Sequence, residues 1–202
     1  MRKREEQASC QGAEPPQLPE AVEAETLGAA CPPLNVAAWN WSEAGSAHRF
    51  GDYRAGERID HVDGMTVEEA EHMLATRLYQ NTAKVHFNAF ERAKDASRRR
   101  LVYGGVVIST ARALAFNGLE NAGLMLGING GRHVNPYFAG GTIFAWSEVL
   151  DKADFGAAGA LRLRLVATKD RPCADFPDKD AEGKYPAEVI LDFDYWAAVP
   201  KR

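Results

Sequence analysis

Two short segments of the 202-residue chain hold the residue types that could carry out acid–base chemistry. The first is the run Asn81-Thr-Ala-Lys-Val-His86. A histidine side chain, with an ordinary pKa of about 6.5, can accept a proton and then return it, and an amide can hold a water molecule by hydrogen bonds. The second is Gly104-Gly105, which precedes a long apolar run. Free backbone N–H groups at a helix start can stabilise a negatively charged oxygen, and glycine lets a ligand approach the backbone closely.

Each of these features also has a structural interpretation. A single histidine in a strand-like run is more often part of the packing than of a catalytic site, and a pair of glycines can simply allow close helix packing. The run Arg98-Arg99-Arg100 could bind phosphates, or it could form a solvated loop. Arg132 and His133 could meet a carboxylate of a ligand, or they could end an exposed strand.

The elements around the first segment are a strand, an amphipathic helix and a second strand-like run. Arg58–Asp63 alternates in the manner of a strand. Thr66 and Glu69 have the spacing of a capping box, which predicts a helix that ends near Tyr79. His86 then lies in the strand-like run Val85–Asn88.

A second helix is predicted over Val106–Phe116. Apolar residues cover nearly every face of this helix, so it should be buried, and Asn117 and Gly118 mark its end. The later strands are expected at residues 124–129, 142–150, 161–168 and 189–199, and the last is rich in β-branched and aromatic residues. One buried helix with several long antiparallel strands indicates an α+β fold in which the sheet wraps around the helix.

Composition narrows the class of protein. Hydrophobic residues make up 46% and charged residues 26% of the chain, as in soluble globular proteins. The net charge of −4 and the pI of about 5.8 argue against a nucleic-acid partner. No run approaches the roughly 18 apolar residues of a membrane span. The three cysteines, Cys10, Cys31 and Cys173, lack the spacing of a zinc site or a disulfide framework, so we expect a cytoplasmic protein without a metal site.

The first 45 residues differ in composition from the rest. They hold three basic and seven acidic residues, which account for the whole net charge, and five of the ten prolines. Such a segment buries too little apolar surface to offset the entropy of ordering it. We therefore expect residues 1–45 to be a disordered linker or tail, ordered at most around Leu34, Trp39 and Trp41, and residues 46–202 to form one domain.

Three segments carry a resemblance to a known family. Asn81–Asn88, the run Tyr103-Gly104-Gly105 before a buried helix, and Asn135–Thr142 follow one another as in the MaoC-like dehydratases, the hydratase branch of the hot-dog fold. Within that family the sequence is most similar to the mesaconyl-CoA hydratases, also called β-methylmalyl-CoA dehydratases. The resemblance covers this chain from about residue 34 to the C-terminus. The family's chains contain two hot-dog halves, and this chain resembles only the second. The resemblance implies that the domain pairs with another half, as a homodimer or with a different chain.

The resemblance also implies roles for single residues. The general hydratase motif of the family is Asp-x-Asn-Pro-x-His, and on this chain its histidine falls on His86, while its aspartate, asparagine and proline fall on Asn81, Ala83 and Lys84. His86 would then act as the base, and Asn81 would position the water. The alternative is that a nearby carboxylate such as Asp63 assists.

The implied reaction is reversible hydration of an enoyl-CoA, mesaconyl-CoA to β-methylmalyl-CoA, without a metal or redox cofactor; coenzyme A would be part of the substrate. Tyr103, Gly104 and Gly105 would bind that substrate, Arg98 its phosphates and Arg132 a free carboxylate. The family often has His-Gly where this chain has Gly-Gly. Alternatives are another hot-dog acyl-CoA enzyme, either a different enoyl-CoA hydratase or a thioesterase, or a non-catalytic partner subunit or fragment.

Overall fold

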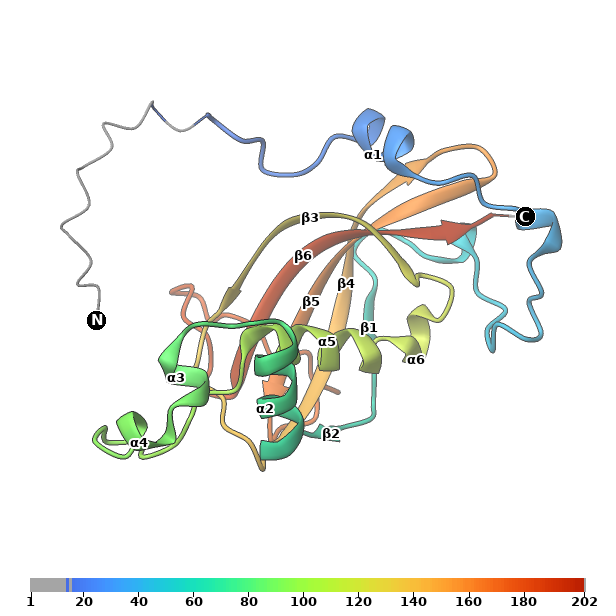
Figure 1. Cartoon of the computed structure of the whole chain (residues 1–202). Helices are drawn as coiled ribbons and strands as arrows, with labels where there is room; N and C mark the ends of the chain where they lie inside the picture. The colour runs from blue at the N-terminus through green and yellow to red at the C-terminus, as the bar shows by residue number, and fades with distance from the viewer. Residues whose placement is uncertain (1–13, 15, 202) are drawn as a thin grey trace.

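The structure, a computed structural model, describes residue 14 and residues 16–201 (Figure 1). The helical elements are α1 (Ala24–Ala30), η1 (Val36–Ala38), η2 (Phe50–Asp52), α2 (Glu69–Leu78), α3 (Lys84–Phe87), α4 (Ala89–Arg92), α5 (Gly104–Leu114) and α6 (Phe116–Leu119). The strands are β1 (Arg58–Asp60), β2 (Met65–Thr66), β3 (Leu124–His133), β4 (Thr142–Asp154), β5 (Ala158–Lys169) and β6 (Val189–Pro200). In the described part of the chain, no helix is long and apolar enough to cross a membrane.

The strands form one antiparallel sheet in the order β1-β4-β5-β6-β3. The short β2 pairs with the N-terminal end of β4. The sheet curves around α5, which lies along its concave face (Figure 1). Val107, Ala111 and Leu114 of α5 are buried against inward-facing side chains of the strands. The predicted α+β architecture, a sheet wrapped around a buried helix, is confirmed, and the four long strands are each longer than predicted.

The outer face of the sheet is covered by chain outside the strands. The loop between β5 and β6 covers Trp146, whose Nε1–H donates to the carbonyl oxygen of Pro177 at 3.1 Å. At the other end α1 places Leu27 against Trp196, and Leu27 is fully buried. The expectation of an unpacked linker through residue 45 therefore does not hold around Leu27; the expectation for residues 1–13 and 15 lies outside the described residues.

Two local predictions around α2 are wrong. Thr66 does not cap the helix, because it lies in β2 and its hydroxyl bonds that of Thr142 at 2.8 Å. The helix begins after Glu68, whose N–H donates to the Glu71 carboxylate at 3.0 Å. The strand-like run around His86 is also not a strand, because residues Lys84–Phe87 form the helical turn α3.

Candidate functional site

His86 lies on the helical turn α3, next to the chain segment that leads into α5. Its Nδ1 lies 3.0 Å from the carbonyl oxygen of Leu101. A carbonyl oxygen can only accept, so Nδ1 carries the proton and Nε2 carries the lone pair. The peptide N–H of Leu101 in turn donates to the carbonyl oxygen of Val85 at 3.2 Å, which holds the two segments together. The Leu101 carbonyl therefore leaves Nε2 of His86 as the atom that can take a proton.

Asn81 lies just beyond the C-terminus of α2 and is committed to a local turn. Its N–H donates to the carbonyl oxygen of Thr76 at 3.0 Å, and its Oδ1 accepts from the N–H of Ala83 at 2.9 Å. The His86 N–H donates to the carbonyl oxygen of Ala83 at 3.0 Å, which makes Ala83 the link between the two residues. Asn81 thus shapes the turn that carries His86.

Tyr103 precedes the first residue of α5 and lies between two other aromatic rings. The ring centroids of Tyr103 and His86 are 5.9 Å apart, and those of Tyr103 and Tyr79 are 6.4 Å apart. The Tyr103 N–H donates to Nδ1 of His72, which is fully buried on α2. Burial lowers the pKa of His72. The charge of His86 lowers this pKa further, whereas the backbone of His86 raises it. His72 therefore joins α2 to the start of α5.

The two glycines at the start of α5 make room for aromatic rings. A Cβ on Gly104 would overlap the imidazole of His133, with ring carbons at 2.9 and 3.0 Å and Nε2 closer still. A Cβ on Gly105 would lie 2.9 Å from two ring carbons of Tyr103. By helix geometry the N–H groups of both glycines have no carbonyl partner within α5. These groups, His86 and His133 thus gather at one end of the helix.

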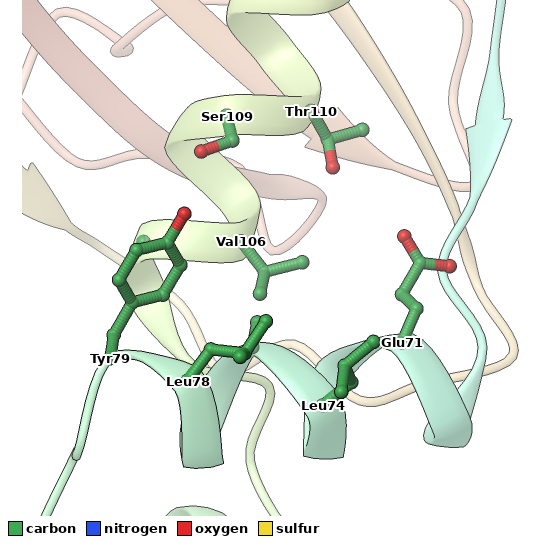
Figure 2. A pocket seen from close by; sticks show the side chains of 9 residues that line it. Glu71, Leu74, Leu78, Tyr79, Val106, Ser109 and Thr110 are labelled. Atoms are coloured by element: carbon green, nitrogen blue, oxygen red, sulfur yellow. The ribbon is translucent and has the colours of Figure 1, made fainter.

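An apolar groove opens beside this end of α5. It has a volume of about 260 Å³ and runs between α2 and α5, from Tyr79 and Gly105 toward Glu71 (Figure 2). Leu74 and Leu78 of α2 point into it and are 58% and 68% exposed. The groove is large enough for a short organic chain to reach Gly105.

Comparison with known proteins shows two hydratase or dehydratase relatives and a similar solved structure. A beta-methylmalyl-CoA dehydratase from Chloroflexus aurantiacus is 53% identical over 207 residues, which cover 100% of this chain and 58% of the relative. A mesaconyl-CoA hydratase from Cereibacter sphaeroides is 57% identical over 170 residues, 83% of this chain and 48% of the relative. A crystal structure of a MaoC domain protein dehydratase from C. aurantiacus matches with a TM-score of 0.88 at 52% identity, over 100% of this chain and 58% of the other. The chain is therefore similar over its whole length to a MaoC domain dehydratase.

The fold of this chain has a second, more distant match. RV0216 from Mycobacterium tuberculosis, described as having a double hot-dog fold, matches with a TM-score of 0.58 at 18% identity, over 77% of this chain and 44% of the other. At that identity the match shows the fold alone, and the predicted hot-dog fold is confirmed. No family model matches the sequence. The chain spans about half the length of the curated relatives it matches.

Two other residues proposed from the sequence, Arg132 and Asp63, lie away from His86. Arg132 pairs in register with Asp192 and lines a polar cavity with Arg162 and Arg164, on the sheet face opposite α5. Asp63 accepts from Nδ2 of Asn117 at 2.6 Å, beyond the other end of α5. These positions remove the structural basis for Arg132 as a contact in this site and for Asp63 as the replacement carboxylate.

The three arginines of the run at residues 98–100 make different contacts. Arg98 is exposed and has a left-handed backbone conformation, with a φ of 49°. Arg99 donates to the carbonyl oxygen of Ala139, and Arg100 forms a 2.5 Å ion pair with Glu69. The run is therefore partly structural, and phosphate binding by Arg98 stays a prediction.

Sequence analysis missed His72. It lies with Thr76 on the buried face of α2, and a polar residue on a packed face is a signal of an internal hydrogen bond. His133 was considered only together with Arg132, as a contact to a ligand's carboxylate, but strand alternation sends these two side chains to opposite faces. Among the described residues no group of three His, Cys, Asp or Glu has a metal-binding arrangement. Burial raises the pKa of the Cys173 thiol to about 11, which opposes a nucleophilic role.

Proposed function

We propose that this domain is a hydro-lyase that adds water reversibly across the double bond of an enoyl-CoA, converting mesaconyl-CoA to β-methylmalyl-CoA. The observation that carries the proposal is the fixed tautomer of His86, which leaves Nε2 as a base beside the start of α5. The names of the two relatives, mesaconyl-CoA hydratase and beta-methylmalyl-CoA dehydratase, supply the substrate.

In the proposed reaction Nε2 of His86 takes a proton from water while the water oxygen bonds to the β-carbon of the substrate. The electron pair of the carbon–carbon double bond moves toward the thioester, and negative charge develops on its oxygen. The N–H groups of Gly104 and Gly105 stabilise that charge, aided by the helix dipole. The α-carbon then takes the proton from the His86 imidazolium, so one water is added and the histidine is restored.

The carbonyl of Leu101 supports this cycle because it accepts from Nδ1 in both protonation states of His86. Asn81 assists by shaping the turn that carries His86, and in this proposal its amide also holds the water by hydrogen bonds. The groove beside Gly105 gives the acyl thioester a route to the helix start. The proposed reaction needs no metal or redox cofactor, and coenzyme A enters as part of the substrate.

The proposal includes a second hot-dog half. β3 is an edge strand of the described sheet and pairs only with β6 there. Its Ile128 is 58% exposed, and an unpaired apolar edge is a surface on which another strand can pair. We infer that β3 meets a second half, either a copy of this chain or another chain. The free thiols of Cys31 and Cys173 support a reducing, cytoplasmic setting.

The test is to mix the purified chain with mesaconyl-CoA and follow the loss of enoyl-thioester absorbance. The expected result is loss of absorbance with β-methylmalyl-CoA identified by mass, and no loss with His86→Gln. Light scattering on the same sample measures the oligomeric state. A dimer that leaves mesaconyl-CoA unchanged contradicts the hydratase proposal and favours a partner subunit. Release of free coenzyme A instead would indicate a thioesterase.

A further inference from the structure

The imidazole of His133 occupies the place of the side chain that Gly104 lacks. A Cβ built on Gly104 meets three atoms of the His133 ring and none of any other residue among its nearest neighbours, and Nε2 is the nearest of the three. The ring therefore points with Nε2 first at the initial residue of α5. Any larger residue at position 104 would displace it.

Strand register explains how His133 reaches this place. His133 pairs with Leu191 of β6, whose side chain is buried in the core that contains α5. Its neighbour Arg132 pairs with Asp192, which bonds Arg164 on the opposite face. Since paired residues in an antiparallel sheet share a face, His133 points toward α5 and Arg132 points away from it.

The contact with Gly104 puts the His133 imidazole at the start of α5. Gly104 has no side chain, so the place beside it is open to another residue. His133, the last residue of β3, brings an imidazole to that place. The ring is also solvent-accessible and lines a cavity of about 310 Å³ that includes Leu101, the residue whose carbonyl holds His86. The two histidines thus flank the start of α5.

We propose that His133 is a further catalytic residue of this site, and that its Nε2–H donates a hydrogen bond to the thioester oxygen of the enoyl-CoA as negative charge develops there. The inference rests on the proposed hydration and assigns it a side-chain donor beside the backbone donors of α5. No bond to hydrogen breaks at His133; the proton that moves belongs to the water and to His86.

The electrostatic surroundings of His133 agree with a neutral donor. Burial against α5 lowers the pKa of its imidazole, and the positive charge that His86 can carry lowers it further. A neutral imidazole has one N–H donor, which suits a hydrogen bond to an oxygen that becomes negative only in the transition state.

Two variants test the role from opposite sides. His133→Phe keeps a ring over Gly104 and removes both nitrogens, whereas Gly104→Ala keeps the histidine and pushes its ring away. Each should lower kcat for mesaconyl-CoA by about 10²-fold and change KM by less than about threefold, because the lost contact acts mainly in the transition state. His133→Gln, which keeps an N–H donor, should recover part of the loss. The matched control His48→Phe replaces an exposed histidine that makes an edge-to-face contact with Tyr53, and it should leave kcat unchanged.

Retention of kcat within about twofold in both His133→Phe and Gly104→Ala would overturn the inference while the hydratase proposal stands. If the wild-type chain does not hydrate mesaconyl-CoA, the hydratase proposal fails, and imidazole NMR decides the inference separately. The probe is methylsuccinyl-CoA, the saturated thioester of the same carbon skeleton. A shift of the His133 signals with the His48 signals unmoved supports thioester contact, and unmoved His133 signals contradict it.

Discussion

The two ends of α5 hold histidines in opposite situations. Beyond its C-terminal end, His61 is fully buried, with Nδ1 at 2.7 Å from the carbonyl oxygen of Asn117 and Nε2 at 2.8 Å from the hydroxyl of Ser147. At its N-terminal end, the His86 ring is hydrogen-bonded within the described part of the chain through Nδ1 and not through Nε2. The neighbouring His133 is solvent-accessible. A histidine with both nitrogens satisfied fixes the fold, whereas one with a free nitrogen can act on a ligand.

The surroundings of His61 form a closed network. Nδ2 of Asn117 donates to the carbonyl oxygen of His61 at 3.0 Å and to the Asp63 carboxylate at 2.6 Å. Burial lowers the pKa of His61, and the Asn117 carbonyl raises it by a smaller amount. This network joins β1, β4 and the turn after α5, so its removal should affect stability rather than chemistry.

The largest expected effect is at the open end of α5. His86→Gln keeps a hydrogen-bonding group near Leu101 and removes the base, so kcat for mesaconyl-CoA should fall about 10³-fold. The free energy of unfolding should change by less than about 0.5 kcal/mol, because the side chain is only partly buried. Steady-state kinetics and urea denaturation of the same preparations measure both quantities. A large loss of stability would place His86 with His61 as a structural histidine.

The next effect is at the closed end. His61→Leu leaves the Ser147 hydroxyl and the Asn117 carbonyl without their buried partner, which should lower the free energy of unfolding by about 3 kcal/mol. At a temperature where the variant is folded, kcat should stay within about twofold of wild type, because His61 is remote from His86. Urea denaturation gives the first value and the enoyl-thioester assay the second. A variant as stable as wild type would show that the network contributes no net stability.

A third prediction concerns pH. The pKa of His61 is lowered from 6.5 in the folded protein, so below pH 6.5 the unfolded chain binds more protons than the folded one. The stability from neutral His61 is therefore complete above pH 6.5 and is lost as the pH falls below it, by up to about 1.4 kcal/mol per pH unit. His72 and His133, with pKa values lowered by burial, act in the same direction. Urea titrations at pH 7.5, 6.0 and 5.0 should show this decline, and His61→Leu should show a shallower one.

The sequence predicted the α+β architecture because long apolar and β-branched runs leave few alternatives, and α5 and β3–β6 follow from them directly. It did not predict the turn around His86, because Val85 and Phe87 suggest a strand while the actual conformation depends on the Leu101 contact, 15 residues away in sequence. Thr66 was misplaced for the same reason: its local capping pattern competes with a strand pairing to Thr142.

The candidate site was predicted in part. His86, Tyr103 and the two glycines gather at one end of α5, as the family motif implied. The contribution of His133 could not be predicted, because it depends on which face of β3 each side chain takes, and the irregularities in the register of β3 change that alternation. Contacts that join distant segments through strand register are therefore the part of a site that a local pattern does not show.

The smallest expected effect concerns Asn81, where the family has a carboxylate. Asn81→Asp keeps an oxygen that can accept from the N–H of Ala83, so the turn carrying His86 should be preserved. A carboxylate can also hold the water, and kcat should therefore stay within about threefold of wild type or rise. Asn81→Ala removes the turn contact and should lower kcat further than Asn81→Asp does. If Asn81→Asp folds but is inert, Asn81 does not hold the water, and its part in the site is limited to the turn that carries His86.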